Sequence, residues 1–262
     1  MDILNKIIAR KKIEVAALKR STTIKELKEG PFFQMETLSL RDFLLRKDKT
    51  GIIAEFKRKS PSKGIINNSS KVQEVTSAYA KFGASGISVL TDQDFFGGSM
   101  QDLKDATINK VPLLRKDFII DEYQIYESKS WGAGVILLIA ACLSKNQVKQ
   151  LATVAKNLGL NVLLEIHNER ELGHICNEVD VVGVNNRDLK SFVVDINCSI
   201  GLSGKIPGGK VKISESGIDS VATIQLLQEC GFNGFLVGEK FMKEKNPGQA
   251  FQNFTKELKE KL

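Results

Sequence analysis

The chain has 262 residues, of which 42% are apolar and 26% charged, and these are ordinary values for one folded domain with a sizeable core. Lysine and arginine outnumber aspartate and glutamate by 38 to 31, which gives a net charge of +7. A positive chain can attract nucleic acids, membranes or phosphorylated metabolites. The basic residues are scattered and are not interleaved with aromatic residues, so the sequence argues against a nucleic-acid groove.

The sequence lacks the marks of a secreted, membrane-spanning or metal-binding protein. The first residues form no apolar signal-peptide core, and the longest apolar stretch, residues 132–143, is shorter than the roughly 20 residues that span a bilayer. The four cysteines are widely spaced without a CxxC pair, which predicts free buried thiols in a reducing compartment. His167 and His174 lack matched partners, so we expect surface or core histidines without a metal. We expect a cytoplasmic protein.

Residues 1–50 are the first predicted unit, a helical extension. Apolar residues recur at helical spacing, at Ile3, Leu4, Ile7 and Ile8. Ser39 is a predicted helix start, with Asp42 placed to reach back to it. No linker rich in proline, glycine or serine follows. We therefore expect the extension to pack on the rest of a single domain, residues 1–262, and to cover one mouth of it.

Eight short apolar runs follow the extension. They are continuous rather than alternating, as in strands that are covered on both faces. The predicted strands are residues 52–56, 87–91, 112–117, 135–141, 162–167, 181–186, 212–216 and 235–239.

Helical patterns with recognisable ends lie between these runs. Aspartate and serine suit a helix start because they accept hydrogen bonds from free backbone N–H groups, and glycine suits a helix end. Starts are predicted at Asp121, Ser144 and Asp219-Ser220, and ends at Gly83, Gly159 and Gly231. Eight strand–helix units predict an α/β fold, a closed (β/α)8 TIM barrel. An open doubly wound sheet is less favoured because no GxGxxG follows the first strand.

Polar residues gather at the C-terminal ends of the predicted strands, where parallel barrels carry their catalytic groups. They are Glu55, Lys57, Lys116, Asp117, Glu165, Asn185, Arg187, Glu215 and Ser216. A single polar residue at a strand end is common because such ends are exposed to solvent. Burying charges this close to a core, however, costs free energy unless they are paired. The whole set at one end of the barrel predicts an active site.

Three glycine-bearing loops predict a phosphate site at the same end. Barrels often hold phosphate with backbone N–H groups of the loops after strands seven and eight. The seventh strand ends in Ser216-Gly217 and the eighth in Gly238-Glu239, and residues 60–64 add serine and lysine donors after the first strand. One such loop would be an ordinary turn, but three in register indicate a phosphorylated small-molecule substrate.

Several segments resemble the indole-3-glycerol phosphate synthase family, in the same order along the chain. The most specific are IIAEFKRKSPSKG at 52–64 and LLRKDFIID at 113–121. Further similar segments are LTDQDFFGGSMQDL at 90–103, VVGVNNRDLKSF at 181–192, SESGI at 214–218 and LVGEKFM at 236–242. The N-terminal helices are similar to the extension of that family too.

The resemblance implies a carbon–carbon lyase of tryptophan biosynthesis. Such an enzyme closes a ring on 1-(2-carboxyphenylamino)-1-deoxyribulose 5-phosphate, with loss of CO₂ and water, to give indole-3-glycerol phosphate. No cofactor and no metal are implied. By resemblance, Lys116 is the general acid at the ketone, Glu165 is its acid–base counterpart in the dehydration, and Lys57 holds the carboxylate and can donate a proton. Orienting roles fall to Glu55, Asn185, Arg187, Glu215 and Ser216, and phosphate binding to Ser60, Gly217, Gly238 and the backbone N–H of Glu239.

Two electrostatic expectations follow from these roles. A lysine acid works best with a lowered pKa. We expect Lys57 and Lys116 to lower each other's pKa, with Glu55 and Glu165 restraining the change. The side chain of Glu239 would repel a phosphate, so we expect it to point away.

Other functions fit parts of the pattern. A phosphoribosylanthranilate isomerase or a Schiff-base aldolase using Lys116 would share the phosphate loops, although the isomerase leaves the Glu55-x-Lys57 pair without a role. A basic nucleic-acid-binding module would need aromatic platforms that the sequence lacks. A barrel without catalytic activity would not need the charged residues at its strand ends. We expect a monomer or weak homo-oligomer that binds neither nucleic acid nor membranes.

Overall fold

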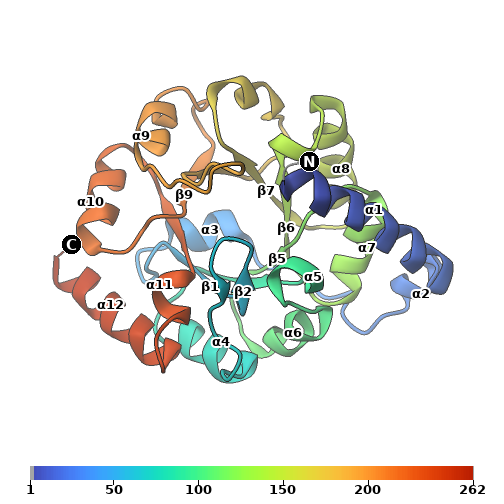
Figure 1. Ribbon diagram of the computed structural model, residues 1–262, viewed down its shortest axis with the longest axis horizontal. Coiled ribbons are helices and arrows are strands. Elements are labelled where there is room, and N and C mark those ends of the chain that lie inside the picture. Colours follow the sequence, from blue (N-terminus) through green and yellow to red (C-terminus); the bar gives the residue numbers. More distant parts are fainter. Residues whose placement is uncertain (1–2, 262) are drawn as a thin grey trace.

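The eight predicted strands form one closed barrel. The computed structural model describes residues 3–261, and its barrel strands run parallel in the order β1-β10-β9-β8-β7-β6-β5-β4 (Figure 1). They are β1 (Ile52–Phe56), β4 (Gly86–Leu90), β5 (Leu113–Lys116), β6 (Val135–Ile139), β7 (Asn161–Ile166), β8 (Val181–Asn185), β9 (Val211–Glu215) and β10 (Gly234–Val237). The predicted TIM barrel is confirmed.

Helices surround the barrel on all sides (Figure 1). They are α1 (Ile3–Ser21), α2 (Ile24–Lys28), α3 (Leu40–Leu45), α4 (Val72–Lys81), α5 (Gln93–Phe96), α6 (Met100–Asp105), α7 (Glu122–Ser130), α8 (Lys145–Asn157), α9 (Asn197–Ser203), α10 (Val221–Glu229), α11 (Glu239–Met242) and α12 (Pro247–Lys261). Within residues 3–261, no helix combines the length and the apolar character needed to cross a membrane.

The predicted helix starts are confirmed by their hydrogen bonds. Asp121, Ser144 and Ser220 each accept a hydrogen bond from the first turn of the helix that follows. Ser39 likewise accepts from the backbone N–H of Asp42, but no return bond from the Asp42 side chain completes a capping box. The three predicted helix ends, Gly83, Gly159 and Gly231, all have positive φ.

Local structure differs from the prediction at three places. Residues 140–142 form a 3-10 turn rather than the end of β6, and α11 begins at Glu239, inside the predicted last strand. After β1, the loop that carries Ser60 folds as a hairpin of β2 (Lys59–Ser60) and β3 (Gly64–Ile65), which stands before the barrel mouth in Figure 1. The sequence predicted a loop only, because two-residue strands leave no pattern.

The alternation of side chains along each strand decides which residues reach the barrel interior. On β1, Ala54 and Phe56 pack into the layer between sheet and helices, whereas Ile53 belongs to the inner cluster. Glu55 lies two residues beyond Ile53 and therefore shares the inward face. The inner cluster contains Leu40, Leu44, Ile53, Leu114, Val135, Leu137, Ile139, Leu163, Val181, Val211, Ile213 and Leu236.

The N-terminal extension lies at one mouth of the barrel, as predicted, and it also contacts the opposite end. Leu40 and Leu44 of α3 join the inner cluster at the end where the strands begin. The backbone N–H of Leu40 donates to Oδ1 of Asn161, the first residue of β7, at 3.1 Å. At the opposite end, Ile3 and Ile7 of α1 line a cavity at the strand C-termini.

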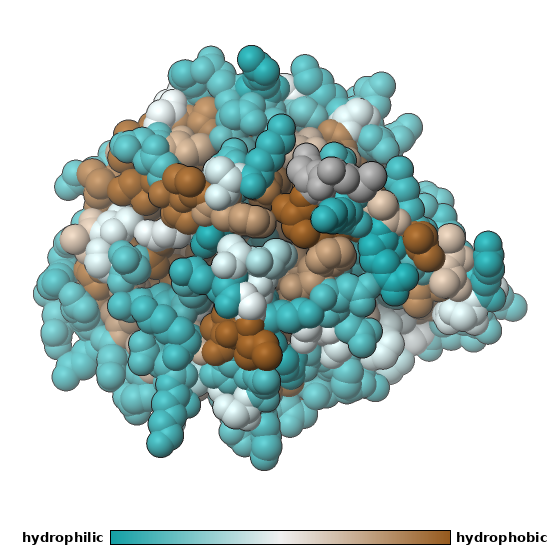
Figure 2. All heavy atoms as spheres, in the orientation of Figure 1, coloured by the Kyte–Doolittle hydropathy of each residue, from teal (hydrophilic) through white to brown (hydrophobic). Residues whose placement is uncertain are grey.

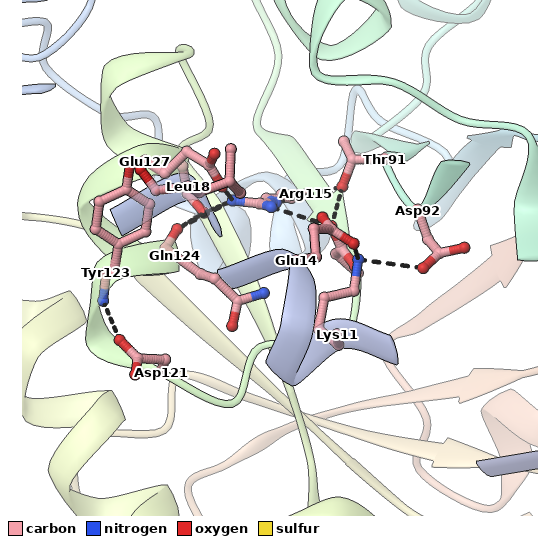
Figure 3. Close-up of polar contacts among 12 residues, drawn as sticks. Lys11, Glu14, Leu18, Thr91, Asp92, Arg115, Asp121, Tyr123, Gln124 and Glu127 are labelled. Atoms are coloured by element: carbon pink, nitrogen blue, oxygen red, sulfur yellow. Dashed lines mark hydrogen bonds and ion pairs between the residues drawn. The ribbon is translucent and has the colours of Figure 1, made fainter. Parts of the chain in front are cut away.

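Buried ion pairs attach α1 to the barrel (Figure 3). Lys11 of α1 is fully buried, and its Nζ lies 3.1 Å from Asp92 and 3.0 Å from Asp117. The second oxygen of Asp117 is 3.0 Å from Arg115, whose other nitrogen lies 2.7 Å from Glu127 of α7. Because every one of these charges has an opposite charge beside it, the network satisfies groups that would otherwise be costly to bury.

Candidate active site

Two adjoining cavities open at the C-terminal ends of the strands. The first has about 1000 Å³ of space, its opening to solvent included, with apolar walls and charged residues at its floor. The second, about 1290 Å³ on the same basis, is mainly polar. The structure brings all twelve predicted site residues to this mouth. Glu55, Lys57, Ser60, Lys116, Glu165, Asn185, Arg187, Glu215, Ser216 and Glu239 line the first cavity, and Gly217 and Gly238 line the second.

Lys116 lies at the charged floor between two carboxylates. Its Nζ is 3.1 Å from Oε2 of Glu165 and 3.8 Å from Oε2 of Glu215. Both glutamates are buried. Gly183 of β8 makes room for Glu215, because a Cβ at that position would collide with its Oε1. This Oε1 is buried and accepts no hydrogen bond from the described residues.

The electrostatics of Lys116 are the reverse of the sequence expectation. Burial by itself would lower the pKa of Lys116, but the Glu165 and Glu215 carboxylates outweigh it and hold the pKa above its ordinary value. Lys116 is therefore an ammonium group at neutral pH. Burial and the Glu165 charge raise the pKa of Glu215. The expected lowering of the Lys116 pKa was wrong because two carboxylates, not a second lysine, are its nearest charged neighbours.

Lys57 forms a separate ion pair with Glu55, two residues earlier on the same face. The Nζ–Oε1 distance is 2.6 Å, and both side chains are largely buried. Glu55 packs against the backbone of Gly238, where an added Cβ would lie 2.6 Å from the same Oε1. A glycine at position 238 thus lets the Glu55–Lys57 pair and the loop after β10 share one corner of the mouth.

Asn185, Arg187 and Ser216 are held by one another. The Ser216 hydroxyl donates to Oδ1 of Asn185 at 2.9 Å, and the same oxygen accepts from the backbone N–H of Arg187 at 3.0 Å. Ser216 has a φ of 67°, and Gly217 has a φ of 73°. A left-handed turn is uncommon for a serine, and here it turns the chain sharply where β9 ends.

Glu239 does not point away from the cavities as we expected. Its carboxylate lies 3.8 Å from Lys63 on one side and 3.8 Å from Arg187 on the other. Both cations line the polar cavity, so Glu239 occupies the space between two groups that would attract a phosphate. The expectation failed because it considered repulsion by a phosphate and left out attraction by these two cations.

Replacing Glu239 with glutamine is expected to lower the KM for a phosphorylated substrate about two- to fivefold, since exposed charge pairs are worth about 1 kcal/mol or less. The change frees Lys63 and Arg187 without removing either. Steady-state kinetics at low and high salt would measure it, and the effect should shrink at high salt. Glu244→Gln, on an exposed residue of the same segment, is the control. A KM that is unchanged or raised in Glu239→Gln would contradict the expectation.

The structure adds residues that strand-end polarity alone did not identify. An apolar wall of the first cavity comes from Ile3, Leu4, Ile7, Leu90, Phe96, Phe118, Leu137, Ile139, Leu189, Phe192 and Leu236. Apolar surface adjoins polar surface around the hollow of this face in Figure 2.

His167 was considered a surface or core histidine, but its Nε2 lies 3.3 Å from Glu165. A signal existed, because His167 follows Glu165 by two residues and so shares its face of the strand.

Comparison with known proteins assigns the family. The family model described as indole-3-glycerol phosphate synthase matches residues 4–254. The chain belongs to the indole-3-glycerol phosphate synthase family. It is 46% identical to the indole-3-glycerol phosphate synthase of Bacteroides thetaiotaomicron, over 98% of this chain and 99% of that protein. It is 42% identical to the synthase of Polynucleobacter asymbioticus, over 95% and 97%, and 41% identical to that of Neisseria meningitidis serogroup B, over 92% and 95%.

The indole-3-glycerol phosphate synthases are carboxy-lyases of tryptophan biosynthesis, and this chain is an enzyme of that kind. The resemblance that the sequence segments predicted is therefore confirmed, and with it the expectation of a phosphorylated small-molecule substrate. Among the described residues, no group of three or more His, Cys, Asp or Glu side chains is arranged to hold a metal ion. The four cysteines are free thiols, partly rather than fully buried.

Proposed function

We propose that the two cavities bind 1-(2-carboxyphenylamino)-1-deoxyribulose 5-phosphate in one orientation. The polar cavity suits the phosphate, and the apolar wall of the first cavity suits the aromatic ring. Lys57, on the border between the two, suits the ring carboxylate. The observation that supports this most strongly is the division itself: one mouth has an apolar half and a cationic half, as a substrate with a benzoate at one end and a phosphate at the other requires.

Lys116 is the proposed general acid. The ring carbon that bears the carboxylate attacks the ketone carbon, a C–C bond forms, and the electron pair of the carbonyl moves to its oxygen. The ammonium group of Lys116 supplies the proton that turns this oxygen into a hydroxyl. Loss of CO₂ then returns the bonding electrons to the ring. The raised pKa of Lys116 keeps the donor form fully populated at neutral pH.

Glu165 is the proposed acid–base group of the dehydration. The new hydroxyl takes up a proton and leaves as water, and the methylene carbon next to the nitrogen in the new ring loses a proton, which completes the indole. A carboxylate 3.1 Å from Lys116 can exchange protons with it between the two stages. Glu55, Asn185, Arg187, Glu215 and Ser216 orient the substrate and the two lysines in this proposal. The unpartnered Oε1 of Glu215 is available to a substrate hydroxyl.

The proposed phosphate site uses Ser60, Gly217, Gly238 and the backbone N–H of Glu239. Gly217 and Gly238 line the polar cavity at the ends of β9 and β10, and Ser60 approaches from the hairpin after β1. Lys63 and Arg187 add positive charge beside them. Backbone N–H groups in such loops suit an anion because they point at it with little loss of side-chain entropy.

We also propose that residues 1–262 are a single domain with residues 1–50 as its extension. The contacts of α1 and α3 with opposite ends of the barrel support this. The free thiols are in keeping with a cytoplasmic enzyme. We propose further that it works as a monomer or weak homo-oligomer and binds neither nucleic acid nor membranes.

Incubation of the protein with the carboxyphenylamino substrate should release CO₂ and produce the fluorescence of indoleglycerol phosphate. The rival aldolase needs a neutral amine at Lys116 to form a Schiff base, which the raised pKa disfavours. Borohydride added during turnover should therefore leave the enzyme active. Trapping of a reduced adduct on Lys116, or no product from a folded protein, would contradict the proposed chemistry.

A further inference from the structure

His167 lies at the end of β7 between two carboxylates. Its Nε2 is 3.3 Å from Oε1 of Glu165, and its Nδ1 is 3.3 Å from Oε2 of Glu171. The same Glu171 oxygen accepts a hydrogen bond from the backbone N–H of His167 at 2.7 Å, which holds this carboxylate against the ring. The imidazole side chain is only 11% exposed. Glu171, His167, Glu165 and Lys116 thus form a row of alternating charge leading into the active site.

We propose that His167 is a positioning residue of this reaction, which stays cationic and keeps the catalytic carboxylate of Glu165 ionised and turned toward Lys116. The proposal rests on the roles proposed above for Glu165 and Lys116. Two carboxylates at close range strongly favour the charged form of a buried imidazole.

The electrostatic effects at both ends of the contact agree with this geometry. Burial alone would lower the pKa of His167, but Glu165 and Glu171 outweigh it and raise the pKa to about 10. Burial alone would raise the pKa of Glu165, but the Lys116 and His167 cations outweigh it and lower the pKa below its ordinary value. His167 is therefore charged, and Glu165 ionised, across the neutral pH range.

The described groups that face this row from neighbouring elements are acidic or neutral, so Lys116 and His167 are its cations. They are Glu55 on β1, Glu215 on β9, Asn185 on β8, Cys142 after β6, Cys198 on α9 and Asn168 beside Glu171. The Cys198 thiol donates to the His167 carbonyl oxygen at 3.0 Å. Burial raises the pKa of both thiols, so they add no negative charge at neutral pH.

The contact between His167 and Glu165 is a close ion pair in which the hydrogen-bond geometry is poor. Nε2 is buried and makes no hydrogen bond of good geometry to the described residues. A nearby charge favours the carboxylate form of Glu165 and holds it toward Lys116 less tightly than a well-formed hydrogen bond would. Glu165 can therefore turn toward the substrate and exchange a proton, and the His167 cation favours release of that proton after each turnover.

The test is the pH dependence of kcat in the His167→Asn variant. Without the cation, the pKa of Glu165 rises, so the acidic limb should move to higher pH by about one pH unit or more. The KM for the substrate should change much less than kcat does at the acidic pH values. Titration of substrate groups is common to both enzymes and drops out of the comparison. His174→Asn is the matched control, because the ring of His174 lies 3.1 and 3.0 Å from backbone carbonyl oxygens and contacts no carboxylate in these bonds.

Proton NMR of the imidazole signals gives a readout that does not depend on activity. The chain has two histidines, and the His174→Asn variant assigns them. The His167 signal should remain that of the cation up to about pH 9, and Glu171→Gln should lower the pH at which it titrates. A neutral His167 ring at pH 7.5 would overturn the proposal, as would superimposable pH profiles of wild type and His167→Asn.

Glu165→Gln separates failure of this proposal from failure of the proposed function. If Glu165→Gln retains wild-type kcat, the catalytic role of Glu165 is wrong and the positioning role falls with it. If Glu165→Gln is inactive and the acidic limb of His167→Asn is unmoved, only the role of His167 is overturned. Thermal unfolding of each variant identifies any that fail to fold, and for those the NMR titration of wild type and Glu171→Gln decides.

Discussion

Lys116→Met is expected to lower kcat by about 100- to 10,000-fold, which is the usual contribution of a positioned general acid. KM should change little, because the phosphate and the ring carboxylate are held by other residues in the proposed orientation. The measurement is indoleglycerol phosphate fluorescence at saturating substrate. A kcat near the wild-type value would show that the proton reaches the ketone oxygen from another group.

Lys116→Arg is the companion variant that separates the acid from the charge. Methionine leaves Glu165 and Glu215 side by side without a cation, which costs stability and moves a proton onto one of them. Arginine preserves the positive charge but does not release its proton in the accessible pH range. A folded but inactive Lys116→Arg enzyme would therefore assign the loss to proton donation. If arginine restored most of the rate, charge alone would explain the function of this position.

Lys11→Met is expected to lower the free energy of unfolding by about 3 kcal/mol or more, the usual effect of removing one partner from a buried ion pair. Asp92 and Asp117 would stay buried, each within about 3 Å of the place that the ammonium group vacates. Both carboxylates also make hydrogen bonds within the barrel: Asp92 caps α5, and Asp117 accepts a hydrogen bond from Thr91 at 2.6 Å. Urea unfolding of wild type and variant measures the loss.

Lys12→Met is the matched control for this loss, because Lys12 is the next residue of α1 and is exposed. A surface substitution of that kind normally changes stability by less than about 0.5 kcal/mol. Equal stabilities of Lys11→Met and Lys12→Met would mean that α1 is attached by its apolar contacts and that the charges contribute nothing. Activity should fall in Lys11→Met too, because the displaced helix carries Ile3 and Ile7 of the cavity wall.

The sequence predicted the barrel well because strand formation here depends on local composition. Runs such as residues 162–167 are apolar throughout, and such runs suit a parallel strand covered on both faces. The strand limits were less accurate, as at residues 140–142, because a 3-10 turn can be as apolar as a strand. The candidate site was predictable for a related reason: all parallel strands end at the same side of the barrel, so residues far apart in sequence, such as Glu55 and Glu215, had to meet.

The charge network around Lys11 could not be predicted in the same way. Nothing in the sequence near Lys11 distinguishes it from Lys12, and its partners Asp92 and Asp117 lie in distant loops. Which of two neighbouring lysines is buried depends on the rotation of α1 on the barrel, and that rotation is a property of the packed chain. The pKa of Lys116 was wrongly predicted for a similar reason, since a sequence gives the charges but not the distances between them.

The burial of Lys11 has a consequence for how the chain is made. During synthesis on the ribosome α1 emerges before β4 and β5, yet the carboxylates that pair with Lys11 belong to residues 92 and 117, just after those strands. Until β4 and β5 have left the exit tunnel and joined the sheet, the helix has nothing to dock on, and Ile7 stays exposed to solvent. Helix α1 is therefore packed only after strands that are translated later than it is. Because α1 supplies Ile3 and Ile7 of the cavity wall, that wall is also completed only after β4 and β5 have formed.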